Sequence, residues 1–345
     1  MYELEISNEN VERTLIDDVL KRNECIYNFL QLIYTQDSQV TISIDGEWGA
    51  GKTFFVKQLE YVINKLNVQE NENEQSEITK IINNLKNRLS ESNINTYGNT
   101  RAIYYNACEY DYFEEPILTI IADIIKNNPN IDILNPHIKE SIGNKIDKFL
   151  SSFKVSSSFQ LNNGSTIGIE FQKEKNEGEK SIIEKIILDK ELEKNFKLLL
   201  EDLLVESSNK LIIFIDELDR CNPKFAVKLL EKIKYFFNDD RFIFVFSTNL
   251  NQLQYTIENY YGTNFDGIYY LQKFFDYQLE LSNIKVEDYV RLSIKLIDIY
   301  SRDYFDSAVM DGVKNMQFQL RDCNKYFELL KLKYSDLKKI ARDIL

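Results

Sequence analysis

The first residues that could do chemistry lie at positions 46–53, whose sequence is GEWGAGKT. Glycine, glycine, lysine and threonine occupy every fixed position of the pattern G-x-x-x-x-G-K-[ST]. Glycines let backbone N–H groups turn inward around a phosphate, Lys52 can reach the β- and γ-phosphate oxygens, and the Thr53 hydroxyl can bind Mg²⁺. The pattern predicts a phosphate-binding loop, and a chance match in a turn is the alternative. The residues expected to contact a magnesium-complexed nucleotide are Gly46, Glu47, Trp48, Gly49, Ala50, Gly51, Lys52, Thr53 and Phe54.

A second group of reactive residues follows the apolar run LIIFI at 211–215. Asp216 would hold Mg²⁺ through water, and Glu217 would polarise the attacking water as a general base. Two acids at the end of a strand could equally be a solvated cap. Together with the phosphate loop they predict a nucleoside triphosphatase with Lys52 and Glu217 as catalytic residues.

Further candidates follow the next apolar run, FIFVFS at 242–247. Thr248 and Asn249 stand where a polar side chain could sense the γ-phosphate or orient the water, although Asn249 could instead cap the helix that follows. Arg220 and Arg321 are candidate positive charges for the transition state, with surface ion pairs as the alternative.

These residues require a sheet that brings the ends of several strands together. Apolar runs predict strands at 40–45, 101–106, 210–215, 242–247 and 278–281. Several are almost continuously apolar, which is typical of parallel strands buried on both faces, and helical periodicity follows them. We therefore expect a three-layer α/β fold with about five parallel core strands and the phosphate loop at the carboxyl end of a strand. The long sequence between the two motifs leaves room for an extra strand between the motif strands.

The remaining sequence divides into segments around this core. We expect an N-terminal helical segment at 1–39, with one amphipathic helix beginning near Asp17 or Asp18 and ending before the first strand. The core would comprise 40–129 and 205–285, interrupted by an insertion at 130–204 with helices and a β-hairpin. Residues 286–345 would form a C-terminal helical lid. The hairpin is either a docking surface or a packed decoration of the core.

Composition limits the partners and the compartment. The 42 basic and 55 acidic residues leave a net charge of −13, the wrong sign for a protein that mainly wraps nucleic acid, so nucleic acid would need a local basic groove. The four cysteines form no C-x-x-C pair, which suggests a reducing compartment. Because no apolar run approaches the ~20 residues of a bilayer span and no signal peptide is evident, we expect a cytoplasmic protein without a membrane partner.

Several separated motifs resemble the KAP family of P-loop NTPases. IDGEWGAGKT at 44–53 matches its phosphate loop, including Trp48, and IDELDRC at 215–221 is similar to its second motif, I-D-D-L-D-R-C. The sequence YNACEY at 105–110 looks like its N-A-W-x-Y segment, with Cys108 in place of the tryptophan. Other segments that resemble the family lie at 18–22, 115–118, 270–275 and, more weakly, 320–325.

The resemblance implies a function as well as a fold. It points to ATP and ADP as ligands, to Arg22 beside the nucleotide base and to Arg321 on a lid helix. Glu217 in place of aspartate favours hydrolysis, because glutamate is the usual base in AAA-type ATPases. It further implies a switch or motor that forms a homo-oligomer on nucleotide binding and acts in anti-phage defence with a protein effector. A nucleotide-regulated scaffold without hydrolysis and a P-loop phosphotransferase are the alternatives.

Overall fold

The structure of the chain is a computed structural model. It describes residues 6–18, 20–36, 38–67, 76–92, 94, 100–113, 115–127, 210–236, 239–262 and 264–281, and scattered positions between 290 and 329.

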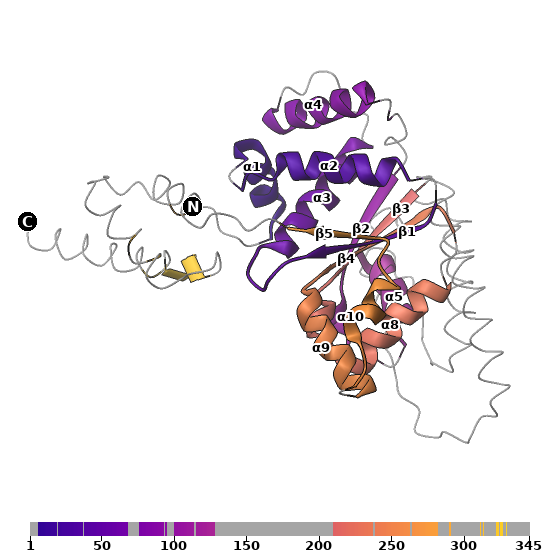
Figure 1. Cartoon of the computed structure of the whole chain (residues 1–345). Helices are drawn as coiled ribbons and strands as arrows, with labels where there is room; N and C mark the ends of the chain where they lie inside the picture. Colours follow the sequence, from indigo (N-terminus) through magenta and orange to yellow (C-terminus); the bar gives the residue numbers. More distant parts are fainter. Residues whose placement is uncertain are drawn as a thin grey trace, which may run out of the picture.

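A five-stranded, wholly parallel sheet forms the centre of the described fold (Figure 1). Its order is β2-β3-β4-β1-β5. The strands are β1 (Val40–Asp45), β2 (Thr100–Asn106), β3 (Lys210–Asp216), β4 (Phe242–Thr248) and β5 (Tyr277–Glu280). The expectation of about five parallel strands is confirmed. The extra strand between the two motif strands β1 and β3 is β4, which follows β3 in the chain and does not come from the long sequence between the motifs.

Helices cover both faces of the sheet and make the fold three-layered (Figure 1). On one side lie α1 (Asn8–Asp17), α2 (Asn23–Tyr34), α3 (Lys52–Leu66) and α4 (Glu77–Glu91). On the other lie α5 (Pro116–Asn127), α8 (Pro223–Phe236), α9 (Leu250–Tyr261) and α10 (Gly267–Gln272). Two short 3₁₀ helices follow strands, η2 (Ala107–Tyr110) after β2 and η4 (Leu218–Arg220) after β3.

The central strands are apolar throughout because each face packs against a different helical layer. On β3, Ile212 and Phe214 belong to the core beneath α2 and α3, whereas Ile213 and Ile215 belong to the core beneath α5 and α8. Alternation by two therefore distributes one apolar run between two cores. Polar residues stand at the carboxyl ends of β1 to β4, namely Asp45, Asn106, Asp216 and Thr248.

The N-terminal segment differs from the single helix that we expected. It forms two helices, α1 and α2, which are separated by a turn with positive φ at Asp18 (42°) and Lys21 (51°). Asp18 Oδ1 accepts hydrogen bonds from the backbone N–H groups of Arg22 and Asn23, at 2.9 and 3.1 Å, so it ends one helix and caps the next. Apolar spacing did not reveal this break, because both helices bury their apolar sides in the same core.

Some sequence expectations concern residues outside the described ranges. The insertion at 130–204 with its hairpin and Arg321 are among them, and only scattered positions of 286–345 are described. None of the described helices has the length and apolar character required to cross a membrane.

Candidate nucleotide-binding site

The loop between β1 and α3 has the backbone of an anion-binding turn. Gly49 and Gly51 have φ values of 87° and 80°, a region that favours glycine, and Gly51 stands at the amino end of α3. The unpaired N–H groups at the start of a helix, with its dipole, favour a negatively charged ligand. The GEWGAGKT sequence thus adopts a conformation suited to phosphate.

Lys52 lies within this loop. Its Nζ donates to the carbonyl oxygen of Gly46 at 2.5 Å and to that of Glu47 at 3.1 Å, and the side chain is buried. Burial lowers the pKa of Lys52, and the negative charges of Asp219, Asp216 and Asp45 oppose that shift. The lysine therefore lies in the negative field of the carboxylates at the carboxyl ends of β1 and β3.

Asp216 ends β3 with a fixed carboxylate. It is 1% exposed, its Oδ1 accepts from the Glu217 N–H at 2.9 Å, and its Oδ2 accepts from the Tyr104 hydroxyl at 3.1 Å. Burial and the neighbouring Asp216 charge raise the pKa of Tyr104, so its phenol keeps the proton that it donates. Nothing in the sequence marked Tyr104 as part of this site.

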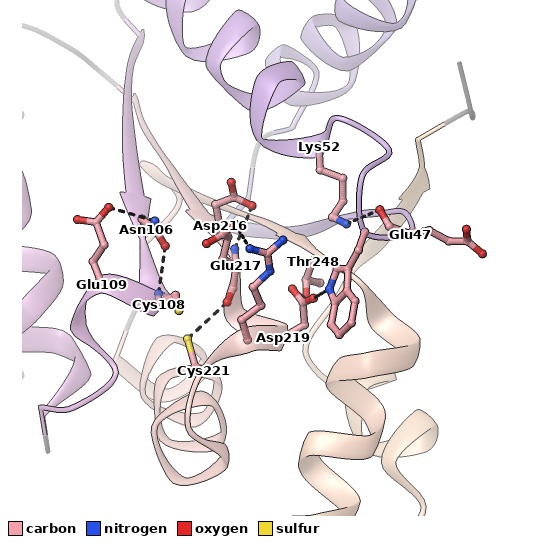
Figure 2. A network of polar contacts seen from close by, with 12 residues as sticks. Glu47, Lys52, Asn106, Cys108, Glu109, Asp216, Glu217, Asp219, Cys221 and Thr248 are labelled. Atoms are coloured by element: carbon pink, nitrogen blue, oxygen red, sulfur yellow. Dashed lines mark hydrogen bonds and ion pairs between the residues drawn. The ribbon is translucent and has the colours of Figure 1, made fainter. Parts of the chain in front are cut away.

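Glu217 follows in a left-handed conformation, with φ 60° and ψ 26°, and its backbone N–H donates to the Ser247 carbonyl of β4. Its Oε1 lies 2.7 Å from Arg220 Nη1 in an ion pair, and its carbonyl oxygen is 3.5 Å from Cys221 Sγ. Figure 2 shows Glu217 beside Asp216, on the same side of the sheet edge as Lys52. The candidate base is thus paired with a candidate arginine of the same loop.

Asp219 connects the phosphate loop after β1 and the loop after β3 to the end of β4. Its Oδ2 accepts from Trp48 Nε1 at 2.5 Å and its Oδ1 accepts from Thr248 Oγ1 at 3.1 Å (Figure 2). The carboxylate is mostly buried, at 8% exposure. Sequence reasoning missed it as a site residue, although its place two residues after Glu217 in DELD was a usable signal.

Asn249 begins α9 as its N-cap, and its Oδ1 accepts from the Gln252 N–H at 3.2 Å. The capping alternative therefore describes its geometry, and the same residue is buried at the end of β4. Asp45, which ends β1, accepts from the Leu250 N–H at 2.9 Å and so ties α9 to the phosphate-loop strand. A role of Asn249 toward phosphate stays a prediction.

Arg22 supports the phosphate loop through the backbone. Its Nη1 and Nη2 donate to the carbonyl oxygens of Gly51 and Ala50, at 2.9 and 2.7 Å. The side chain is 1% exposed and lies 5.5 Å from the centre of the Phe55 ring, and burial lowers its pKa to about 10. Phe54, predicted beside the nucleotide, buries its side chain in the core.

The site fits a magnesium–nucleotide complex. Mg²⁺ is usually held by one or two protein oxygens together with phosphate oxygens, and Thr53 and Asp216 offer oxygens of that kind. Among the residues that the structure describes, no cluster of three or more His, Cys, Asp or Glu could hold a metal ion. Thr53 and Asp216 are the residues whose oxygens would hold Mg²⁺.

A known domain family matches most of this chain. The KAP family P-loop domain matches residues 22–291. An uncharacterized protein of Methanocaldococcus jannaschii, MJ0182, is 39% identical over 89 residues, which are 26% of this chain and 44% of that protein. The solved structure of C. elegans PCH-2 aligns with 87% of this chain and 53% of its own, at 10% identity and a TM-score of 0.26. The chain thus matches less than two thirds of the length of either protein.

Proposed function

Because this chain belongs to the KAP family and carries its P-loop domain, we propose that it binds ATP with Mg²⁺ and hydrolyses it to ADP and phosphate. Membership makes it a nucleotide-binding P-loop NTPase; the choice of ATP, the metal and the hydrolysis are the proposal. One observation carries it: Trp48 of the phosphate loop donates to Asp219 of the second motif at 2.5 Å, which supports a single site shared by the two motifs.

In the proposed reaction, the amides of 46–53 and Lys52 bind the β- and γ-phosphates. Thr53 and Asp216 would hold Mg²⁺, which supplies charge neutralisation on the phosphate oxygens. Glu217 accepts a proton from water as the water oxygen attacks the γ-phosphorus. The bond from that phosphorus to the bridging oxygen breaks, and ADP leaves. Asn249 would orient the water.

The ion pair between Glu217 and Arg220 supports a resting state in which Glu217 is a poor general base. A carboxylate that shares its charge with a guanidinium 2.7 Å away is a weaker base toward water. We propose that the isolated chain hydrolyses ATP slowly and that rearrangement of this loop releases Glu217. The same ion pair favours the second candidate, a nucleotide-regulated scaffold that does not hydrolyse ATP. Arg321 is the other candidate for a charge on the γ-phosphate.

The cellular role extends this proposal. We propose a cytoplasmic switch or motor that forms a homo-oligomer with ATP and works with a protein effector in anti-phage defence, as the family resemblance implies. All four cysteines are free, which supports a reducing compartment. The proposed insertion at 130–204 would contact partners. The proposed C-terminal lid at 286–345 would close over the nucleotide.

Phosphate release from ATP with Mg²⁺ tests the activity. We expect release from the wild type, none from Lys52→Ala because nucleotide no longer binds, and none from Glu217→Gln, which should still bind ATP. Light scattering of Glu217→Gln with and without ATP tests the homo-oligomer. If the wild type binds ATP but releases no phosphate, even after cell extract is added, the scaffold is supported. If ATP is converted to ADP only when a small-molecule acceptor is present, and the phosphoryl group is found on the acceptor, the protein is a phosphotransferase.

A further inference from the structure

The Asp216 carboxylate is held from two directions. The Glu217 N–H fixes Oδ1 from within the same loop, whereas the Tyr104 hydroxyl fixes Oδ2 from the neighbouring strand β2. Each carboxylate oxygen can accept more than one contact, so both remain able to face a cation. Tyr104 is thus the side chain from another element that sets the orientation of this carboxylate.

Tyr104 is in turn held by α3, the helix that begins with Lys52. Its backbone N–H donates to Glu60 Oε1 at 3.1 Å, and Lys57 Nζ lies 3.6 Å from the centre of its ring. Lys57 and Glu60 also form an ion pair at 2.9 Å. Lys57 and Glu60, from the second and third turns of α3, therefore both contact Tyr104, which donates to Asp216.

The same helix is bound along the outer edge of β2. Asn64 donates to and accepts from the backbone of Ala102, at 3.0 and 2.9 Å, and Asn67 does the same with Thr100. Glu60, Asn64 and Asn67 are spaced by four and three residues, so they lie on one helix face and match alternate residues of the strand. Side chains of α3 and of its C-cap Asn67 thus satisfy backbone groups at the edge of β2 that no described strand pairs.

From this chain of contacts we infer that Tyr104 is a positioning residue for the magnesium carboxylate Asp216. The contacts between α3 and β2 keep Thr53, at the start of α3, and Asp216 at a fixed separation. This inference rests on the proposed magnesium–ATP function. Mg²⁺ demands near-ideal octahedral geometry at about 2.0–2.1 Å, so a displaced carboxylate weakens its binding. Groups that orient a metal ligand typically contribute 10–100-fold to metal affinity.

Tyr104→Phe tests the inference, with Tyr105→Phe as the matched control. Tyr105 is the next residue of β2, but it belongs to the opposite core and its hydroxyl bonds Thr119. Calorimetry would measure binding of adenylyl imidodiphosphate over a range of Mg²⁺ concentrations and in EDTA. For Tyr104→Phe we expect the Mg²⁺ concentration at half-maximal binding to rise about tenfold or more, with binding in EDTA unchanged. Tyr105→Phe should match the wild type in both measurements.

A second variant addresses the link to α3. Lys57→Gln removes the cation from the Tyr104 ring and should shift the Mg²⁺ dependence in the same direction by a smaller factor. If Tyr104→Phe and Tyr105→Phe show the same Mg²⁺ dependence, Tyr104 does not position the metal ligand, although the proposed function stands. If the wild type binds the nucleotide without any Mg²⁺ dependence, the proposed function and the inference both fail.

Discussion

Trp48 Nε1 and Asp219 Oδ2 lie 2.5 Å apart, in a hydrogen bond that joins the phosphate loop after β1 to the loop after β3. The other oxygen of Asp219 accepts from Thr248 at the end of β4. One buried carboxylate therefore connects the ends of three parallel strands. Because Trp48 is the only tryptophan of the chain, tryptophan fluorescence reports on this junction, where the residue is 45% exposed.

Replacing Asp219 by alanine should loosen the junction. The variant leaves Trp48 and Thr248 without their acceptor, so we expect tryptophan emission to move to longer wavelength and the free energy of unfolding to fall by about 1–3 kcal/mol. Fluorescence and urea titration measure these effects. Thr248→Val is the control, because it removes one hydrogen bond of Asp219 but leaves Trp48 paired. Wild-type emission in Asp219→Ala would show that the contact does not persist in solution.

Arg220→Ala should free the general base. Without the ion pair, Glu217 can accept a proton from water, and we expect basal phosphate release to increase by about tenfold. The double variant Arg220→Ala/Glu217→Gln should be as inactive as Glu217→Gln, which shows that any gain passes through Glu217. A lower rate in Arg220→Ala would instead assign Arg220 to the developing charge on the γ-phosphate.

Nucleotide affinity should depend on pH through Lys52. Its pKa is lowered by burial, and its charged form binds phosphate. Above this lowered pKa the free protein holds Lys52 uncharged, so the lysine must take up a proton when the nucleotide binds. Nucleotide affinity should therefore fall by up to about tenfold per pH unit, and the fall should begin below the usual lysine pKa of about 10.4. Calorimetry from pH 7.5 to 10.5 would follow this decline. Lys52→Arg stays charged, and an equal decline in that variant would exclude Lys52 as its source.

Substitutions of Asn249 separate its two candidate roles. Asn249→Ala removes the cap of α9 and should lower stability by about 1 kcal/mol, whereas Asn249→Ser retains a capping oxygen and should change it by a few tenths. If the amide also orients the attacking water, Asn249→Ser should release phosphate about tenfold more slowly. Thermal unfolding and phosphate release would be compared on the same samples. If Asn249→Ser releases phosphate at the wild-type rate, Asn249 only caps α9 and does not orient the water.

Local sequence determined the parts of the fold that depend on neighbouring residues. Gly49 and Gly51 have positive φ angles that favour glycine, and apolar runs became strands because a buried parallel strand needs apolar side chains on both faces. The number of parallel strands and the glycine conformations of the loop were therefore predictable without coordinates, and the roles of the loop and of the acids 216–217 stay predictions.

Tertiary structure decided what depends on pairing between distant segments. Spacing along the chain does not state which strands are neighbours, so only the fold identifies β4 as the strand between β1 and β3. Only the fold brings Asp219 to Trp48 and Thr248. The hydroxyl of Tyr104 contacts Asp216 because β2 pairs with β3 in one register, a relationship between residues more than a hundred positions apart. Periodicity within one segment carries no information about such contacts, because they arise from the packing of several segments at once.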